Sequence, residues 1–91
     1  MQFMATITFD PAHQTEVEQH VPAEQVRVRE LQHQGVLESL YIPVGAGAPS
    51  TLWAVFSGES PAGVQRALES LPLYPYMQVH LTPLRQVEAR A

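Results

Sequence analysis

Apolar and polar residues alternate along four short segments of the chain, and alternation of this kind predicts β-strands. The four segments are Gln2–Phe9, 36–44, Thr51–Ser57 and 77–82. One face of the first is strongly apolar and consists of Phe3, Ala5, Ile7 and Phe9. The two faces of the second are Val36, Glu38, Leu40 and Ile42 on one side and Leu37, Ser39 and Tyr41 on the other.

The third of these strands, Thr51–Ser57, is apolar on both faces. Leu52, Ala54 and Phe56 alternate there with Trp53 and Val55. A strand of this kind is usually central in its sheet and covered on both sides. The fourth strand is more one-sided. Its apolar face is Met77, Val79 and Leu81, and its polar face is Gln78, His80 and Thr82.

A long segment with helical spacing, 15–35, separates the first two strands. Its apolar stripe consists of Val17, Val21, Val28 and Leu31. Thr15 with Glu18 fits a capping box at its start, and Gly35 fits a cap at its end. Pro22 interrupts the pattern, so it either kinks one long helix or begins a second one at its first position.

A second, shorter helix is predicted between the last two strands. Ser60 is a suitable N-cap, and Pro61 suits the first turn. Val64, Ala67, Leu68 and Leu71 then follow at helical spacing. Pro72 ends the helix, because proline cannot continue it.

The predicted elements follow the order β-α-β-β-α-β, the ferredoxin-like arrangement of an α+β protein. We predict one domain over residues 1–84, with a four-stranded antiparallel sheet and two helices on one face, and a polar tail over 85–91. Two helices cover only one face of such a sheet. A second copy of the chain, packed sheet against sheet, is the simplest cover for the other face, so we expect a homodimer or a larger homo-oligomer.

The composition of the chain limits the kinds of molecule that it is expected to bind and the cellular compartment in which it is expected to act. The 91 residues carry a formal net charge of -4, and their 5 basic residues are scattered arginines, which argues against a nucleic-acid surface. The absence of cysteine excludes disulfides and thiolate chemistry. No apolar run approaches the roughly 20 residues of a membrane span, and no signal-peptide pattern opens the chain. We therefore expect a cytoplasmic protein that binds neither nucleic acid nor membrane.

The stretch LPLYPYM at 71–77, followed by a strand and by TPL at 82–84, resembles the C-terminal signature of the muconolactone isomerase family. The order of helices and strands matches the family over most of the chain. Individual residues match over 68–84, and Gln34 with Gly35 is a weaker match. The resemblance implies a dimeric α+β barrel, assembled into larger rings in some members. It also implies an isomerase that moves a ring double bond in an unsaturated lactone by relaying a proton, without metal or organic cofactor.

The chain departs from this family in its charged residues. Members of known activity tend to carry lysine in the first helix and arginine, histidine and tryptophan around the second strand. This chain has no lysine, and its second strand reads ESLYI over 38–42. A carboxylate ligand would have few cationic partners there. A neutral or hydrophobic ring compound suits the predicted lining better.

A proton relay needs a base close to the acidic C–H group. Glu24 and Gln25 fill a gap in the apolar stripe of the long helix, so Glu24 is one candidate, pointing between helix and sheet with a pKa raised by burial. Its alternative is a solvated carboxylate paired with Arg27 or Arg29. His80, in the fourth strand, is the second candidate base, and its alternative is an interface or surface histidine.

The relay also needs a donor for the oxygen that becomes negative. The hydroxyl of Tyr74 or Tyr76 is the candidate donor, since alternation after Pro75 places both on one side, and we count Tyr76 with Glu24 and His80 as catalytic. We assign Tyr74, Tyr41 and Trp53 to substrate binding. The alternative for all four aromatic residues is packing in the core or at an interface.

These features together predict a cofactor-free isomerase that acts by proton transfer on a small cyclic substrate, lactone-like or enone-like. Two alternatives stay open: a non-catalytic oligomeric small-molecule-binding or accessory protein that keeps the barrel, and a cofactorless monooxygenase on the same architecture. We predict no metal site. His13, Glu16 and His20 fall at helical spacing but form no open-site ligand triad.

Overall fold

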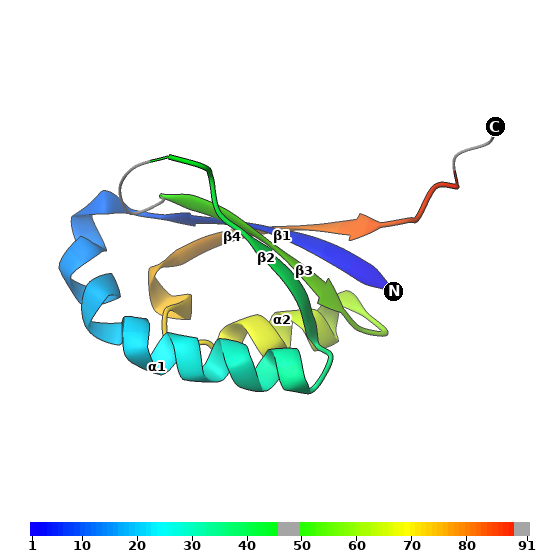
Figure 1. The fold of residues 1–91 in the computed structure, drawn as a ribbon, viewed down its shortest axis with the longest axis horizontal. Helices are drawn as coiled ribbons and strands as arrows, with labels where there is room; N and C mark the ends of the chain where they lie inside the picture. The colour runs from blue at the N-terminus through cyan, green and yellow to red at the C-terminus, as the bar shows by residue number, and fades with distance from the viewer. Residues whose placement is uncertain (46–49, 89–91) are drawn as a thin grey trace.

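The computed structural model describes residues 1–45 and 50–88 of the chain. In chain order the elements are β1 (Gln2–Phe9), the 3-10 helix η1 (Pro11–His13), α1 (Gln14–His33), β2 (Leu37–Tyr41), β3 (Thr51–Ser57), α2 (Pro61–Glu69), the 3-10 helix η2 (Tyr74–Tyr76) and β4 (Met77–Leu84). The strands form one sheet of order β2-β3-β1-β4 in which every neighbouring pair is antiparallel. Both α-helices lie on the same face of this sheet (Figure 1). The predicted ferredoxin-like α+β fold is confirmed.

The hydrophobic core lies between the sheet and the helices. The apolar face of β1 supplies Phe3, Ala5 and Ile7, all at most 2% exposed. The neighbouring strand β3 supplies Ala54 and Phe56, which pair across the strands with Ala5 and Phe3. The largest fully buried side chains are Phe3, Phe56, Leu31, Leu68 and Val64. These contacts fix the helices over the centre of the sheet.

The other face of the sheet carries a row of side chains that crosses all four strands. Tyr41 pairs with Trp53, Trp53 with Thr6, and Thr6 with His80. Tyr41 is 55% exposed, and His80 is also exposed. Within residues 1–45 and 50–88, no helix lies over this row (Figure 1). A second copy of the chain on this face stays a prediction.

The start of α1 differs from the expected capping box. Its N-cap is His13, which makes no side-chain capping bond, and the helix begins at Gln14. The capping group lies earlier, at Asp10, whose side chain accepts the backbone N–H of Ala12 at 2.9 Å. Because η1 runs directly into α1, Thr15 already lies within the helix and does not cap it. The expected capping box was wrong.

Pro22 lies inside a single helix, so the first of its two predicted roles holds. The ribbon of α1 changes direction in its first half (Figure 1). A bend is expected there, since proline lacks the N–H that would continue the helical hydrogen bonds.

The predicted cap at the end of α1 is confirmed. Gly35 has a φ of 75°, and its N–H reaches the carbonyl of Gln32 at 3.1 Å, while the N–H of Val36 reaches Leu31 at 3.0 Å. These two bonds form a Schellman motif, in which glycine accepts a backbone conformation that other residues rarely adopt.

A β-bulge in β2 overturns the expected alternation of that strand. Leu37 pairs with Phe56, Ser39 with Val55 and Leu40 with Ala54, so the register shifts between Leu37 and Ser39. The additional residue in the bulge is Glu38. Leu37 and Leu40 consequently both face the helices, although the sequence pattern had placed them on opposite faces.

The shorter helix follows its sequence signals closely. Ser60 is the N-cap and accepts the backbone N–H of Gly63 at 3.3 Å, and Pro61 is the first helical residue. The helix ends at Glu69 with Ser70 as its C-cap, two residues before the end expected from Pro72, and the segment 70–73 leads back towards the sheet. This segment forms part of the site described next.

Candidate functional site

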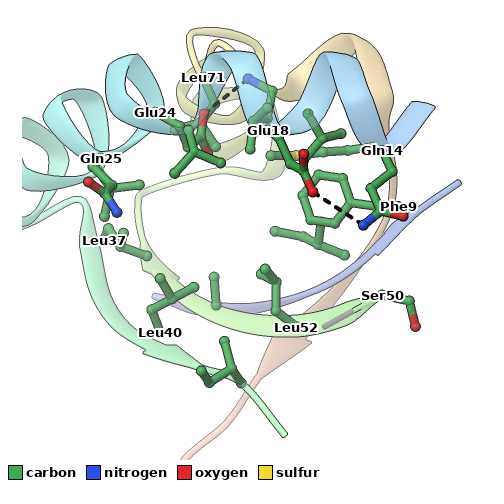
Figure 2. Close-up of a pocket in the computed structure, with 18 of the residues that line it drawn as sticks. Phe9, Gln14, Glu18, Glu24, Gln25, Leu37, Leu40, Ser50, Leu52 and Leu71 are labelled. Carbon is green, nitrogen blue, oxygen red and sulfur yellow. Dashed lines mark hydrogen bonds between the residues drawn. The ribbon is translucent and has the colours of Figure 1, made fainter. Parts of the chain in front are cut away.

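A cavity of about 660 Å³ lies between α1 and the sheet (Figure 2). Its floor comes from β1, β2 and β3 with the first residue of β4, and its roof comes from α1 and the segment 71–73. The apolar part of its lining is Ile7, Phe9, Pro11, Val17, Val21, Val28, Leu37, Leu40, Ile42, Leu52, Ala54, Phe56, Leu71, Leu73 and Met77. The size and the apolar walls suit a small organic molecule.

The bulge in β2 and the small side chain of Ala54 both shape this cavity. Because Leu37 and Leu40 face the same side, β2 contributes two leucines to the wall. Ala54, 2% exposed in the middle of β3, occupies little volume and leaves space beneath α1. The cavity therefore depends on the local geometry of two neighbouring strands.

Glu24 lies at the roof of the cavity, where the apolar stripe of α1 has its gap. Its Oε1 atom accepts the backbone N–H of Leu73 at 3.0 Å. Burial raises the pKa of Glu24 above its ordinary value of 4.5, and the Leu73 N–H opposes this by stabilising the carboxylate. A carboxyl group with a raised pKa is a stronger base once it is ionised, so the placement suits proton transfer.

The segment that supplies this N–H is the LPL of the sequence signature. Leu71 and Leu73 are each 5% exposed and line the cavity. The following Tyr74 accepts a hydrogen bond at its hydroxyl from Nε2 of Gln65, at 2.8 Å. The two buried leucines and the bond from α2 hold the segment, so the N–H of Leu73 keeps its direction towards Glu24.

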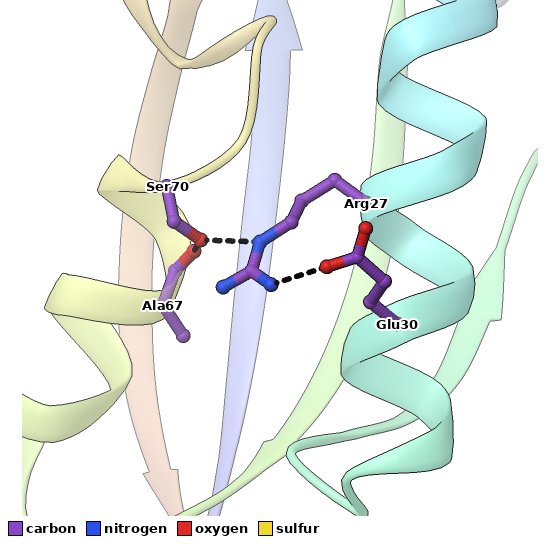
Figure 3. Close-up of polar contacts among 4 residues, drawn as sticks. All are labelled: Arg27, Glu30, Ala67 and Ser70. Atoms are coloured by element: carbon purple, nitrogen blue, oxygen red, sulfur yellow. Dashed lines mark hydrogen bonds and ion pairs between the residues drawn. The ribbon is translucent and has the colours of Figure 1, made fainter.

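A second contact joins α1 to Ser70, the residue just before LPL, one helical turn away from Glu24. Arg27 donates from Nε to the hydroxyl of Ser70 at 3.0 Å and forms an ion pair with Glu30 at 3.0 Å (Figure 3). The Ser70 hydroxyl donates in turn to the carbonyl of Ala67 at 2.6 Å. Arg27 therefore links α1 to the last turn of α2, three residues before Leu73.

The structure places Glu24 apart from the other residues that the sequence suggested for the site. Tyr76 lies beside His13 and His20, with ring centroids 5.7 and 5.6 Å away, and is not part of the cavity lining. His80 is exposed on the opposite face of the sheet. Tyr74 also lies outside the lining.

Tyr41 and Trp53 lie with His80 in the row on the outer face of the sheet. Neither lines the cavity. The cavity thus contains one of the six residues assigned to the site from the sequence, namely Glu24. Roles for the remaining five stay predictions without a contact to this cavity.

Sequence reasoning missed several polar residues of the lining. They are Asp10, Gln14, Glu18, Arg29, Gln32 and Ser50, whereas Gln25 was already noted with Glu24 in the gap of the apolar stripe. The lining residues on α1 could have been predicted from the sequence, because their helical spacing places them on the same face as Glu24. The amides of Gln14, Gln25 and Gln32, the hydroxyl of Ser50 and the guanidinium group of Arg29 are possible donors to a ligand oxygen.

Metal ligation finds no support in the described residues. Across 1–45 and 50–88, no three His, Cys, Asp or Glu side chains are grouped closely enough to hold a metal ion. In the same residues, no helix is both long and apolar enough to cross a membrane.

The fold and the site define a small ferredoxin-like α+β protein with an apolar cavity and a half-buried carboxyl group between helix and sheet. Residues 1–89 match the muconolactone delta-isomerase family, and the chain belongs to that family. The resemblance first seen in LPLYPYM is thereby confirmed, and family and fold together support an isomerase-like protein.

One curated relative is a muconolactone delta-isomerase of Cupriavidus pinatubonensis (strain JMP 134 / LMG 1197). It is 38% identical to this chain over 61 residues. The match covers 67% of this chain and 63% of the relative, so the matched region spans less than two thirds of the relative's length.

Two solved structures share the fold. A muconolactone isomerase crystal structure superposes with a TM-score of 0.71 at 24% identity, covering 99% of this chain and 94% of the other. A 5-chloro-2-hydroxyhydroquinone dehydrochlorinase from Burkholderia phenoliruptrix AC1100, in complex with 2,5-dihydroxybenzoquinone, reaches a TM-score of 0.77 at 14% identity and covers 96% of each chain. At these identities the similarity concerns the fold alone.

Proposed function

We propose that this protein is a cofactor-free isomerase that shifts a double bond in a small cyclic, lactone-like or enone-like substrate, with Glu24 as the proton-transferring group. The observation that carries the proposal is the position of Glu24, half-buried in the wall of an apolar cavity with a raised pKa. A group in that setting has a pKa closer to neutral pH, which is what a general base requires. Membership of the muconolactone delta-isomerase family supports the same reaction class.

The proposed reaction is a 1,3-proton shift within the bound ring. The ionised carboxylate of Glu24 removes a proton from the saturated ring carbon next to the conjugated C=C bond, and the C–H electron pair moves through that bond towards the carbonyl oxygen to give a dienolate. The protonated Glu24 then returns the proton to the carbon at the other end, so the double bond moves and no atom is gained or lost. The bond from Leu73 to Oε1 orients the carboxyl group, and Oε2 exchanges the proton.

The enolate oxygen needs hydrogen-bond donors while it carries negative charge. Among the described lining residues, the amides of Gln14, Gln25 and Gln32 are suitable. In Figure 2 the amide of Gln25 lies on the cavity side of α1, above Leu37. These amides take the role that the sequence had suggested for the tyrosines.

Proton exchange tests the proposal directly. A butenolide is incubated with the protein in D₂O, and ¹H NMR follows both loss of the ring proton and movement of the double bond. Glu24→Gln keeps the size of the side chain and an acceptor for Leu73 but loses the base, so we expect the rate to fall about 10²–10⁴-fold. The matched control is Glu16→Gln, an exposed glutamate of α1 outside the lining. An unchanged rate in folded Glu24→Gln, checked by circular dichroism, would sink the assignment.

The same experiment separates the alternatives from the proposal. A non-catalytic binding protein would bind the butenolide without exchanging its proton, and a cofactorless monooxygenase would consume oxygen. We further propose that the protein forms a homodimer or larger homo-oligomer through the outer face of its sheet and acts in the cytoplasm.

A further inference from the structure

The charged side chains around the cavity are mainly acidic. Asp10, Glu18 and Glu24 line it, against one guanidinium group among the described residues, that of Arg29. The lining therefore carries a net negative charge whether Glu24 is ionised or protonated. Every other described lining residue is apolar or an uncharged polar residue.

The remaining basic side chains of residues 1–45 and 50–88 lie outside this lining. They are His13, His20, Arg27, His33, Arg66, His80 and Arg85. Arg27, the nearest along the chain to Glu24, is held by its ion pair and its bond to Ser70. The two histidines near the start of α1 pack against Tyr76. The described residues thus supply few cationic groups to the cavity.

Two of the three carboxylates are held in place at one end of the cavity. Asp10 accepts the backbone N–H of Ala12 at 2.9 Å, and Glu18 accepts the side-chain amide of Gln14 at 3.2 Å (Figure 2). A ligand that enters at this end therefore meets two carboxylates at the solvent-exposed rim of the cavity.

The third carboxyl group, that of Glu24, disfavours binding of an anionic ligand in a different way. It faces apolar walls, where water screens charge poorly, and burial already disfavours its ionised form. A second anion in the same space would raise the pKa of Glu24 further, because like charges disfavour each other's ionised forms. An anionic substrate would thus suppress the base that its own conversion requires.

Building on the proposed function, we infer that the cavity selects an uncharged ring, a small neutral lactone or enone without a carboxylate substituent. The apolar walls bury the ring, and the amides of Gln25 and Gln32 are available to its carbonyl oxygen. The acidic lining disfavours the matching carboxylate, so selection rests on repulsion of the wrong ligand as well as on attraction of the right one.

A matched pair of ligands tests this inference on the wild-type protein without turnover. The pair is a saturated γ-butyrolactone that carries a carboxymethyl group and the methyl ester of the same compound, neither of which has a ring double bond to move. Isothermal titration calorimetry at neutral pH should show the ester binding at least about tenfold more tightly, a difference of about 1.4 kcal/mol. The preference should shrink in about 1 M salt, where the Debye length falls to about 3 Å.

Two substitutions identify the groups responsible. Glu18→Gln removes one negative charge from the lining and should reduce the preference for the ester over the acid severalfold. Arg29→Gln tests the alternative that the guanidinium group of Arg29 binds the carboxylate of the acid and so favours an anionic ligand. If that substitution selectively weakens binding of the acid, the inference is wrong.

The inference and the proposed function fail in distinguishable ways. Equal or tighter binding of the acid, or no binding of the ester at millimolar concentration, overturns the inference. Binding of the ester without proton exchange in a butenolide overturns the proposed isomerase and leaves the ligand class intact.

Discussion

The contact between Arg27 and Ser70 offers a quantitative test of how α1 is tied to the segment that orients Glu24. Arg27→Met keeps most of the aliphatic stem and the helix propensity but removes every donor. The Arg27 side chain is 28% exposed and that of Glu30 is 52% exposed, so their ion pair is weak, about 0.2–0.5 kcal/mol. The bond to Ser70 adds about 0.5–1.5 kcal/mol.

We therefore expect Arg27→Met to lower the free energy of unfolding by about 1–2 kcal/mol in total. In a domain of this size, each kcal/mol corresponds to a fall in Tm of about 4–8 °C. Ser70→Ala loses the same bond together with its own bond to the carbonyl of Ala67. The double variant should consequently be less destabilised than the sum of the two single variants, by about 0.5–1.5 kcal/mol.

The assay is thermal and urea unfolding followed by circular dichroism, at one protein concentration because any self-association would change the apparent stability. Arg66→Met is the matched control, since Arg66 is an exposed arginine of α2, and it should change stability by less than about 0.5 kcal/mol. Additive effects of Arg27→Met and Ser70→Ala, within about 0.3 kcal/mol, would refute the reasoning.

Three further predictions address the site and the core. Because the pKa of Glu24 is raised in the folded state, the contribution of this group to stability is fully present below pH 4.5 and is lost as the pH rises through the folded pKa. The stability of the wild type relative to Glu24→Gln should therefore fall from about pH 4 to 8 in urea titrations. Gly35→Ala should cost about 1–2 kcal/mol, from backbone strain alone, because no atom lies within 4 Å of the added Cβ. Leu68→Ala, at a position that is 0% exposed, should cost about 2–5 kcal/mol in the same unfolding assay.

Each of these predictions has an outcome that contradicts it. A pH-independent stability difference would mean that the pKa of Glu24 is the same in the folded and unfolded states. Stability in Gly35→Ala equal to that of the wild type would show that the C-terminal cap of α1 tolerates a side chain. A loss below about 1 kcal/mol for Leu68→Ala would place that residue outside the rigid core.

The sequence predicted most of the fold because its strands and helices carry strong local signals. The bounds of β1 and β3 agree with the alternating segments, and α2 begins where Ser60 and Pro61 indicated. The predictions that failed concern places where a single residue changes the local backbone geometry. The bulge at Glu38 reverses the facing of β2, and the capping group of the first helical segment is Asp10 rather than Thr15.

The site was only partly predictable, for a physical reason. Glu24 stood out because a polar residue in an apolar helical stripe must face the interior. Tyr74 and Tyr76 were assigned by strand alternation, but they lie in a 3-10 turn, where that period does not apply. The donor to Glu24 is the backbone N–H of Leu73, and no residue type in the sequence identifies such a group.

Trp53 is the one tryptophan of the chain, and it points away from the cavity on the far side of a single layer of strands. Its fluorescence is therefore an intrinsic probe of the outer face, where docking of another copy would shift the emission to shorter wavelength. Filling of the cavity should leave that emission nearly unchanged. Dilution and ligand titrations read at this one chromophore can thus measure self-association separately from ligand binding.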